Sequence, residues 1–224
     1  DGPGVRFVVF MQGCPLRCKF CHNPETWDFN IESASYTPEE LIKKILNYKP
    51  YFKHNGGVTF SGGEPLMQKE FLLECLKLCK ENDINTCLDT AGSIIDCEEI
   101  LKYTDLVIFD IKGTNTNNYK YMTGGNFNNS VKFLKLCEKS NKKLWLRVVI
   151  VPGINDNDNY INELIEFIKP LKNVEKVEFL PYHTYGVHKY EELGISYPLK
   201  GICDMDIDKC KMLENKLKEG LKLI

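Results

Sequence analysis

Short β-rich runs alternate with longer amphipathic runs along almost the whole sequence, and this alternation constrains the fold more than any other feature. The β-rich runs are strong in Val, Ile and Phe and show little period-two alternation, as expected for parallel strands covered on both faces. Six strand-and-helix units predict either an open doubly wound sheet or a partial TIM-like barrel. The predicted strands are residues 5–11, 57–61, 84–89, 105–112, 144–151 and 174–180.

The helices between these strands are indicated by apolar spacing and by capping residues. Thr37 is followed by Pro38 at the first helical position and by Glu40 at the third, which has the form of a capping box. Residues 115–129 are rich in Asn and Gly and predict a surface loop. The predicted helices are residues 37–48, 68–81, 96–102, 130–141, 159–168 and 206–219.

Composition and charge exclude several classes of protein. The chain has 224 residues, of which 43% are hydrophobic and 27% charged, so it can bury a sizeable core, and we expect one domain over residues 1–224. Lys and Arg (29) nearly balance Asp and Glu (31), which argues against a nucleic-acid partner. We find no membrane-length apolar run and no signal peptide, and expect a cytoplasmic protein without a membrane partner. The abrupt start at Asp1 predicts that a short N-terminal piece is missing.

Three of the ten cysteines are crowded between Cys14 and Cys21. Clustered cysteines in a long chain without a secretory signal favour metal ligation over a disulfide scaffold. Cys75 and Cys79 have ligand-like spacing, but also the i, i+4 spacing of one helix face, which favours packing. We predict that all seven remaining cysteines are core residues, since buried free thiols behave as small apolar groups. They are Cys75, Cys79, Cys87, Cys97, Cys137, Cys203 and Cys210.

The clustered cysteines Cys14, Cys18 and Cys21 follow the first predicted strand, where a dinucleotide-binding fold would carry GxGxxG instead. A [4Fe–4S] cluster ordinarily uses four cysteine thiolates, so three would leave one iron open to a small molecule. The alternative is a structural zinc site completed by His22. Adjacent residues rarely surround one tetrahedral metal well, and zinc motifs usually pair two distant halves. Spacing alone leaves both kinds of metal site open.

Polar or Gly-rich sequence follows the other predicted strands as well, and the carboxyl ends of barrel strands build active sites. Asp110 and Lys112 are two apart on one strand, so their side chains share a face. A charged pair emerging from an apolar run is costly unless it serves a polar ligand, although a structural ion pair is the alternative. Arg147 interrupts a strand and needs a buried partner.

The spacing C-x₃-C-x-aromatic-C, with Phe20 as the aromatic residue, is similar to the signature of the radical S-adenosylmethionine (SAM) superfamily. Within it the chain resembles the short activases of glycyl-radical enzymes, of the type that acts on pyruvate formate-lyase. The resemblance implies a single radical SAM domain folded as a partial TIM-like (β/α)₆ barrel. It covers nearly the whole chain in order, through residues 1–6, 12–14, 21–24, 26–27, 57–64, 87–90, 110–112, 147–153, 180–183, 186 and 188–189.

The same resemblance implies the site residues. Cys14, Cys18 and Cys21 would hold a [4Fe–4S] cluster whose open iron chelates SAM. A sodium or potassium ion near the SAM carboxylate would be bound by Asp89, Thr90 and Asp110. The entrance for the partner enzyme would be lined by Asp1, His22, His188 and Lys189. SAM itself would be contacted by Phe20, Cys21, His22, Gly62, Gly63, Glu64, Asp110, Ile111, Lys112 and His183.

The implied reaction begins when flavodoxin or ferredoxin reduces the cluster. SAM is then cleaved to methionine and a 5′-deoxyadenosyl radical, which abstracts hydrogen from a backbone glycine of pyruvate formate-lyase. Activases with a cysteine-rich ferredoxin-like insert are disfavoured, because no cysteine lies between Cys21 and Cys75. The activase of anaerobic ribonucleotide reductase has a similar Cys-His-Asn-Pro motif but a shorter chain. A non-catalytic zinc-binding adaptor is the alternative from another class.

Overall fold

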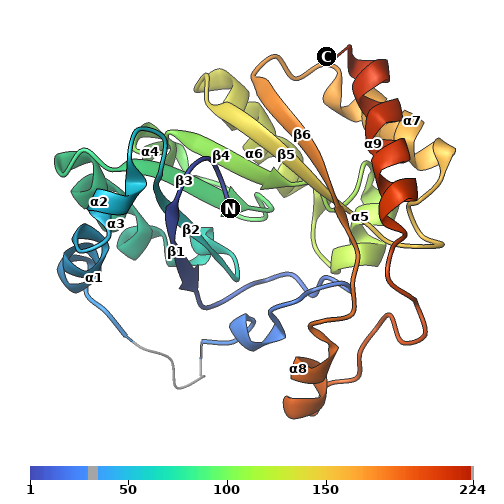
Figure 1. Ribbon diagram of the computed structural model, residues 1–224, viewed down its shortest axis with the longest axis horizontal. Helices are drawn as coiled ribbons and strands as arrows, with labels where there is room; N and C mark the ends of the chain where they lie inside the picture. Colours follow the sequence, from blue (N-terminus) through green and yellow to red (C-terminus); the bar gives the residue numbers. More distant parts are fainter. Residues whose placement is uncertain (30–34, 223–224) are drawn as a thin grey trace.

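The computed structural model describes residues 1–29 and 35–222, which contain one open sheet of six parallel strands (Figure 1). Each strand pairs with the next in sequence, so the spatial order equals the chain order. This order confirms the predicted partial (β/α)₆ barrel and excludes a doubly wound sheet, in which the strand order reverses. The strands are β1 (Arg6–Met11), β2 (Gly57–Gly62), β3 (Asn85–Thr90), β4 (Leu106–Asp110), β5 (Lys143–Ile150) and β6 (Val174–Pro181).

Helices connect the strands and flank the curved sheet, with α1–α3 beside one end and α7 and α9 beside the other (Figure 1). The predicted capping box is confirmed, since Glu40 N donates to Thr37 Oγ1 at 3.2 Å and Thr37 N to Glu40 Oε2 at 2.9 Å. The helices are α1 (Pro38–Leu46), α2 (Lys49–Phe52), α3 (Lys69–Glu81), α4 (Glu98–Lys102), α5 (Thr116–Thr123), α6 (Phe127–Lys139), α7 (Asp158–Ile168), α8 (Val187–Glu192) and α9 (Ile207–Leu221), with 3₁₀ turns η1 (Pro24–Thr26) and η2 (Pro65–Gln68).

The surface loop predicted over residues 115–129 is wrong, because this segment forms α5 and the start of α6. Its asparagines are capping residues. The Asn115 side chain accepts from the backbone N–H of Asn118, whose own side chain accepts from the Asn115 N–H. Gly124 then ends α5 in the left-handed conformation. Asn126 caps α6, which therefore starts before the predicted residue 130.

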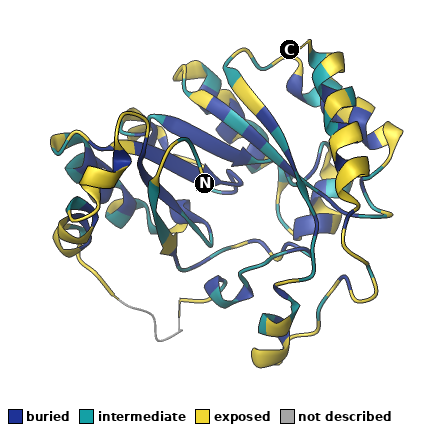
Figure 2. Cartoon of the chain, viewed as in Figure 1, coloured by how far each residue is buried: buried dark blue, intermediate teal, exposed yellow. Residues whose placement is uncertain are grey.

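The core follows the strands, as the dark blue ribbon of Figure 2 shows. Strands β2 to β4 are buried almost continuously, as predicted, whereas β5 alternates between buried and half-buried residues. The half-buried Arg147 and Val149 of β5 face a cavity inside the barrel, which explains the alternation. The core prediction is confirmed for six cysteines and wrong for Cys203, which is exposed in the segment before α9. Within the described residues, we find no helix with the length and apolarity of a membrane span.

Candidate functional site

A cavity of about 310 Å³ lies at the carboxyl ends of β1 to β6 and brings most of the predicted site residues together. Ile111 lies outside its lining; it is buried, and its N–H donates to Arg147 O at 2.8 Å. His183 also lies outside. The predicted residues that do line the cavity are Asp1, Cys14, Cys18, Phe20, Cys21, His22, Gly62, Gly63, Glu64, Asp89, Thr90, Asp110 and Lys112.

Backbone hydrogen bonds hold the cysteine loop, residues 12–23, in place against neighbouring segments. On one side, Cys14 N donates to Trp27 O at 3.1 Å. On the other, Arg17 N donates to Thr123 O and Lys19 N to Met122 O, each at 2.9 Å. These bonds tie the loop to the turn η1 and to the end of α5. The asparagine-capped helix that the sequence analysis missed therefore supports the cysteines.

Gly62 and Gly63 allow the cysteine loop to lie directly against the end of β2. Gly62 has φ +102°, and a Cβ there would lie 2.5 Å from Met11 N and 2.7 Å from Met11 O. A Cβ on Gly63 would lie 2.5 Å from Gly13 O. Since Glu64 N donates to that same carbonyl oxygen at 2.8 Å, the close approach is used for a hydrogen bond. Both positions therefore require glycine for the packing of the protein itself, in addition to any contact with a ligand.

Of the three cavity cysteines, Cys18 is buried and Cys14 and Cys21 are half-buried. Burial raises the pKa of Cys14 to about 11 and that of Cys18 to about 12. Burial also raises the pKa of Cys21, although hydrogen bonds from the Asn23 backbone and the Trp27 side chain partly offset it. Thiols of this kind are protonated at neutral pH, so a bound metal must displace their protons. The raised pKa values show that these thiols lack the activation of a nucleophilic thiol.

A network of four charged residues forms another part of the cavity wall. Arg147 on β5 contacts Asp89 Oδ1 at 2.5 Å and Asp110 Oδ1 at 3.2 Å, and Lys112 contacts Asp110 Oδ2 at 3.0 Å. Asp89 also accepts from Ser61 Oγ at 2.8 Å. Arg147 thus has one buried and one half-buried carboxylate partner, and Asp110 and Lys112 form the ion pair that was the alternative to a ligand-binding role.

The pKa values within this network follow from burial and charge. Burial alone would raise the pKa of Asp110, but Lys112 and Arg147 more than offset it and lower the pKa. Burial, followed by the charge of Asp110, raises the pKa of Asp89 despite the opposing effect of Arg147. Lys112 keeps a raised pKa, because Asp110 and Cys18 outweigh its desolvation. The wall therefore presents a fixed ammonium and carboxylate to the cavity.

Glu64 is buried at the cavity wall, with 1% of its surface exposed. Its carboxylate accepts from Thr90 Oγ1 at 2.6 Å, from Ser93 Oγ at 3.2 Å and from the N–H of Leu66 at 3.3 Å. Burial nevertheless raises its pKa. These partners join the ends of β2 and β3, so the observed hydrogen bonds of Glu64 and Thr90 are internal to the protein.

The segment after β6 folds back onto the cysteine loop from the other end of the sheet. The His183 ring stacks on His22 with centroids 4.1 Å apart, and His22 Nε2 lies 3.0 Å from His183 O. Tyr190 Oη donates to Cys21 O at 2.9 Å. Lys189 Nζ lies 2.5 Å from Glu25 Oε1, whereas His188 is exposed. The segment thus orients His22 at the cavity edge.

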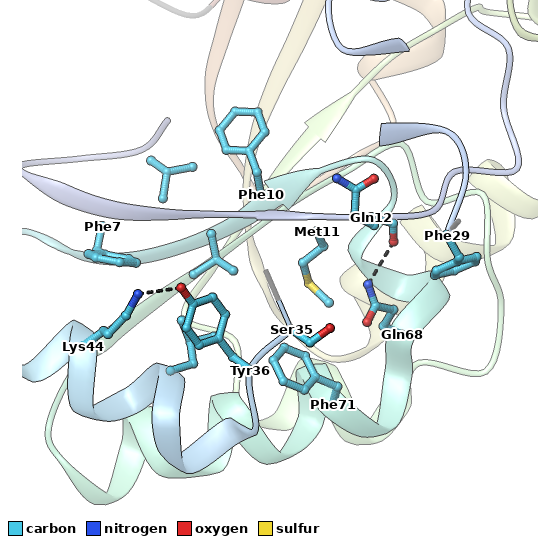
Figure 3. A pocket seen from close by; sticks show the side chains of 13 residues that line it. Phe7, Phe10, Met11, Gln12, Phe29, Ser35, Tyr36, Lys44, Gln68 and Phe71 are labelled. Atoms are coloured by element: carbon cyan, nitrogen blue, oxygen red, sulfur yellow. Dashed lines mark hydrogen bonds between the residues drawn. The ribbon is translucent and has the colours of Figure 1, made fainter. Parts of the chain in front are cut away.

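A second hollow of about 460 Å³ lies outside the barrel beside β1 (Figure 3). It is bordered by Phe7, Tyr36 and Phe71, with Lys44 Nζ donating to Tyr36 Oη at 2.5 Å. Its lining contains none of the predicted site residues, and no two of its lining side chains form an ion pair among the described contacts. The chemistry of the molecule is therefore concentrated in the cavity inside the barrel.

The donors of the inner cavity fit an iron–sulfur cluster with an open iron. Three thiols line one cavity, and within residues 1–29 and 35–222 no three His, Cys, Asp or Glu side chains converge on a single ion position. A [4Fe–4S] cluster ordinarily uses four thiolates, so three thiols in one cavity suit a cluster with one open iron. The ammonium and carboxylates of the same cavity suit a ligand that carries both an amino and a carboxylate group.

Comparisons with known proteins agree with this geometry. The profile of the Radical SAM superfamily matches residues 8–168. A pyruvate formate-lyase-activating enzyme of Clostridium pasteurianum is 53% identical over 224 residues, which covers 99% of this chain and 94% of that protein. Its counterpart in Staphylococcus epidermidis is 44% identical over 220 residues, covering 94% of this chain and 88% of that protein. The chain belongs to the radical SAM superfamily and, within it, to the family of pyruvate formate-lyase-activating enzymes. Membership implies a [4Fe–4S] cluster and SAM as cofactors.

Solved structures support the fold. Streptococcus suis SuiB bound to precursor peptide SuiA superposes with a TM-score of 0.74 at 17% identity, covering 98% of this chain. The chain spans 46% of SuiB, about half its length. A domain of pyruvate-formate lyase-activating enzyme from Bacteroides vulgatus has a TM-score of 0.58 at 21% identity, over 75% of this chain and 93% of that domain.

Sequence reasoning missed some residues that shape the site. Trp27 contacts the cysteine loop from the adjacent segment, and Tyr190 contacts it from a distant one. Ser61 donates a further hydrogen bond to Asp89. Ser61 stands directly before the two glycines at a strand end, which was a usable signal. Nothing in the sequence pairs Tyr190 with Cys21, because only the tertiary fold brings them together.

Proposed function

We propose that this chain activates pyruvate formate-lyase by abstracting a hydrogen atom from one of its backbone glycines, and that residues 1–224 form a single radical SAM domain. The observation that carries the proposal is a single cavity lined by three thiols and by a carboxylate–ammonium pair. When bound, the cluster and SAM supply a one-electron reductive cleavage that delivers a hydrogen-abstracting radical. The protein supplies orientation and a site shielded from water.

In this proposal Cys14, Cys18 and Cys21 ligate the cluster and leave one iron for SAM. The carboxylate of Asp110 would bind the amino group of SAM, and the ammonium of Lys112 would bind its carboxylate. The Lys112 ammonium lies 5.0 Å from the centre of the Phe20 ring, so both groups belong to one wall. The remaining proposed SAM contacts are Cys21, His22, Gly62, Gly63, Glu64, Ile111 and His183.

Two of those contacts require an indirect role or a movement. Glu64 is satisfied by protein donors, so it would act by holding the end of β3 beside SAM. His183 lies behind His22, and its buried Nδ1 has no hydrogen-bond partner among the described residues. A ligand acceptor or donor at the cavity edge would satisfy that nitrogen once the His22 ring turns aside.

We further propose a monovalent cation, sodium or potassium, held by Asp89, Thr90 and Asp110. Support comes from the nearness of the two carboxylates, which Arg147 bridges. Asp89 and Thr90 already have protein partners, so the ion would have to share those oxygens with Arg147, Ser61 and Glu64. Potassium- and sodium-free assay buffer is expected to lower the rate of SAM cleavage, and an unchanged rate would remove the cation from the proposal.

The partner segment would enter beside Asp1 and His22, which line the cavity, with His188 exposed nearby on α8. Lys189 would act there mainly through its ion pair with Glu25. Flavodoxin or ferredoxin would supply the electron. The cytoplasm, a reducing compartment, suits a chain in which all ten cysteines are free thiols.

The test is electron paramagnetic resonance of anaerobically reconstituted protein mixed with pyruvate formate-lyase, SAM and a chemical reductant. A glycyl-radical doublet that depends on SAM supports the proposal. Methionine release without a doublet would keep SAM cleavage but overturn the target, and anaerobic ribonucleotide reductase would then be the substrate to try. Zinc without iron or sulfide, and without absorption at about 400 nm, would overturn the cluster itself. Cys14→Ser should abolish the doublet, whereas Cys203→Ser, at an exposed thiol, should preserve it.

A further inference from the structure

The outer side of the cysteine loop carries cations that the proposed chemistry does not use. Leu16, Cys18 and Phe20 are buried and line the cavity, whereas Arg17 and Lys19 alternate with them on the other side of the loop. A single thickness of chain therefore separates the cavity from this surface. We define the basic surface as Arg17, Lys19 and Lys120 together with the ring of Tyr121.

The basic surface is held rigidly. Lys19 Nζ lies 3.7 Å from the centre of the Tyr121 ring, which is 56% exposed. The guanidinium of Arg17 lies 4.8 Å from the centre of the Trp27 ring. Because the N–H groups of Arg17 and Lys19 donate to α5, the loop and the helix form one continuous face. Lys120 is exposed on that helix, next to Tyr121 in the chain.

The basic surface is also directly connected to the thiols. Cys18 lies in the chain between Arg17 and Lys19. Trp27, which stacks against Arg17, has a side-chain hydrogen bond to Cys21. A redox group seated on this surface would therefore be separated from the cluster thiolates by one backbone segment or one indole ring. Asp1 and His22, which line the cavity and mark the proposed entrance for the partner segment, are not part of this surface.

We propose that the basic surface is the docking site for a small acidic one-electron carrier protein, an inference that rests on the proposed function. The carrier gives up one electron and is oxidised, the cluster gains that electron and is reduced, and the electron then passes to the SAM sulfonium as its carbon–sulfur bond breaks. The chain as a whole has a net charge of −2, so a local cationic face would steer an acidic carrier to this loop. The only acidic side chain paired with it among the described contacts is Asp28, 3.6 Å from Arg17, and both groups are exposed.

The substitutions that test this must leave the loop intact. Arg17 Nη1 donates to Cys14 O at 2.7 Å and to Leu16 O at 3.0 Å, so Arg17 stays unchanged. The test variant is Lys19→Glu/Lys120→Glu, with Lys19→Gln/Lys120→Gln as a milder second variant. The matched control is Lys135→Glu/Lys139→Glu, because these exposed lysines lie on the second half of α6, toward the amino ends of the strands.

Each holoenzyme, matched for iron and sulfide content, is mixed anaerobically with reduced flavodoxin or with photoreduced 5-deazariboflavin, a small neutral reductant. Cluster reduction is followed by stopped-flow bleaching at about 400 nm, and flavodoxin affinity by fluorescence anisotropy. We expect the Glu variant to be reduced by flavodoxin about tenfold more slowly at low salt, with weaker binding and a smaller salt dependence. The Gln variant should show a smaller loss, while the control and all deazariboflavin rates stay unchanged.

Three results would overturn the docking site. Equal slowing with both reductants would mean that the lysines act on the cluster. An unchanged flavodoxin rate would exclude carrier docking here. An unchanged flavodoxin rate together with a raised KM for pyruvate formate-lyase would assign the surface to the partner enzyme. Since cluster reduction is read without any glycyl radical, failure of the proposed function would leave this measurement intact and distinguishable.

Discussion

The hydroxyl of Tyr190 donates a 2.9 Å hydrogen bond to the backbone carbonyl oxygen of Cys21, 169 residues earlier in the chain. Tyr190 is fully buried, so its hydroxyl has no access to water as a substitute partner. Tyr190→Phe removes this bond and keeps the ring, and should lower the free energy of unfolding by about 1 kcal/mol.

The same substitution should make the reconstituted protein lose iron to a chelator several-fold faster, because Cys21 loses its support. Tyr160→Phe on α7 is the control, since Tyr160 is also buried but far along the chain from the cysteine loop. It should cost stability without speeding iron release. Equal iron release from both variants would show that the bond to Cys21 has no role in cluster retention.

Arg147 compensates two buried carboxylates, and its removal should be costly. Its side chain is 13% exposed, and those of Asp89 and Asp110 are 8% and 23% exposed. Arg147→Gln should lower the free energy of unfolding by about 3 kcal/mol, because a broken buried pair leaves charge uncompensated. Arg147→Lys keeps the positive charge and should lower the free energy of unfolding by less.

The loss of stability caused by Arg147→Gln should also depend on pH. Burial and Asp110 already raise the pKa of Asp89 above its unfolded value, and loss of Arg147 raises it further. A carboxyl group whose pKa is higher in the folded than in the unfolded protein lowers the free energy of unfolding at pH values above its unfolded pKa. This loss of stability disappears as the pH falls and the group becomes protonated in the folded protein. The difference in free energy of unfolding between Arg147→Gln and the unsubstituted protein should therefore become smaller as the pH falls from roughly 8 to roughly 5. A constant difference in urea titrations would contradict this assignment.

Gly62→Ala should be far more damaging than an alanine at another glycine of positive φ. Its Cβ would meet Met11 backbone atoms at 2.5 and 2.7 Å, so the end of β1 and the cysteine loop that follows it must move away from β2. We expect a loss of more than about 2 kcal/mol and poor cluster loading. Gly153→Ala, with φ +73° and no atom within 4 Å of the added Cβ, isolates the backbone cost of about 1 kcal/mol. Similar losses for both would mean that the close approach is relaxed cheaply.

Cys203 should be the fast-reacting thiol outside the cavity. Cys203 is exposed, whereas the six other cysteines outside the loop are buried, and burial raises the pKa of Cys75 and Cys79 to about 12. Brief alkylation of the holoprotein, read by peptide mass spectrometry, should label Cys203 first, and Cys203→Ser should remove that label. Labelling of Cys75 at a comparable rate would show that α3 opens readily.

The six strands and the polar residues at their carboxyl ends could be predicted from sequence, because both depend on local pattern, whereas the strand order was implied only by the family resemblance. Asp110 and Lys112 needed only the two-residue repeat of a strand to be placed on one face. The predicted pairing of Arg147 needed only the cost of a buried cation. These arguments use residues close together in the chain or general physical limits.

The features that could not be predicted from sequence depend on capping geometry and on contacts between distant segments. The asparagines near Asn115 were interpreted as loop formers, although side chains that favour loops also cap helices. Gly62 and Gly63 were interpreted through a ligand, whereas the cysteine loop itself makes the close approach. The stacking of His183 on His22 could not be predicted, since no local pattern joins the first loop to the last strand.

That junction has a consequence for how the protein is made. The cysteines lie at the start of the chain, but their loop is completed by Tyr190 and Lys189 near its end. During synthesis from the amino terminus, the sheet can assemble strand by strand while the thiols still lack this support. The finished metal pocket thus becomes available only after translation has passed residue 190. Cluster delivery is therefore expected only after α8 has folded onto the cysteine loop, and a product truncated before α8 should fold its early strands yet keep iron poorly.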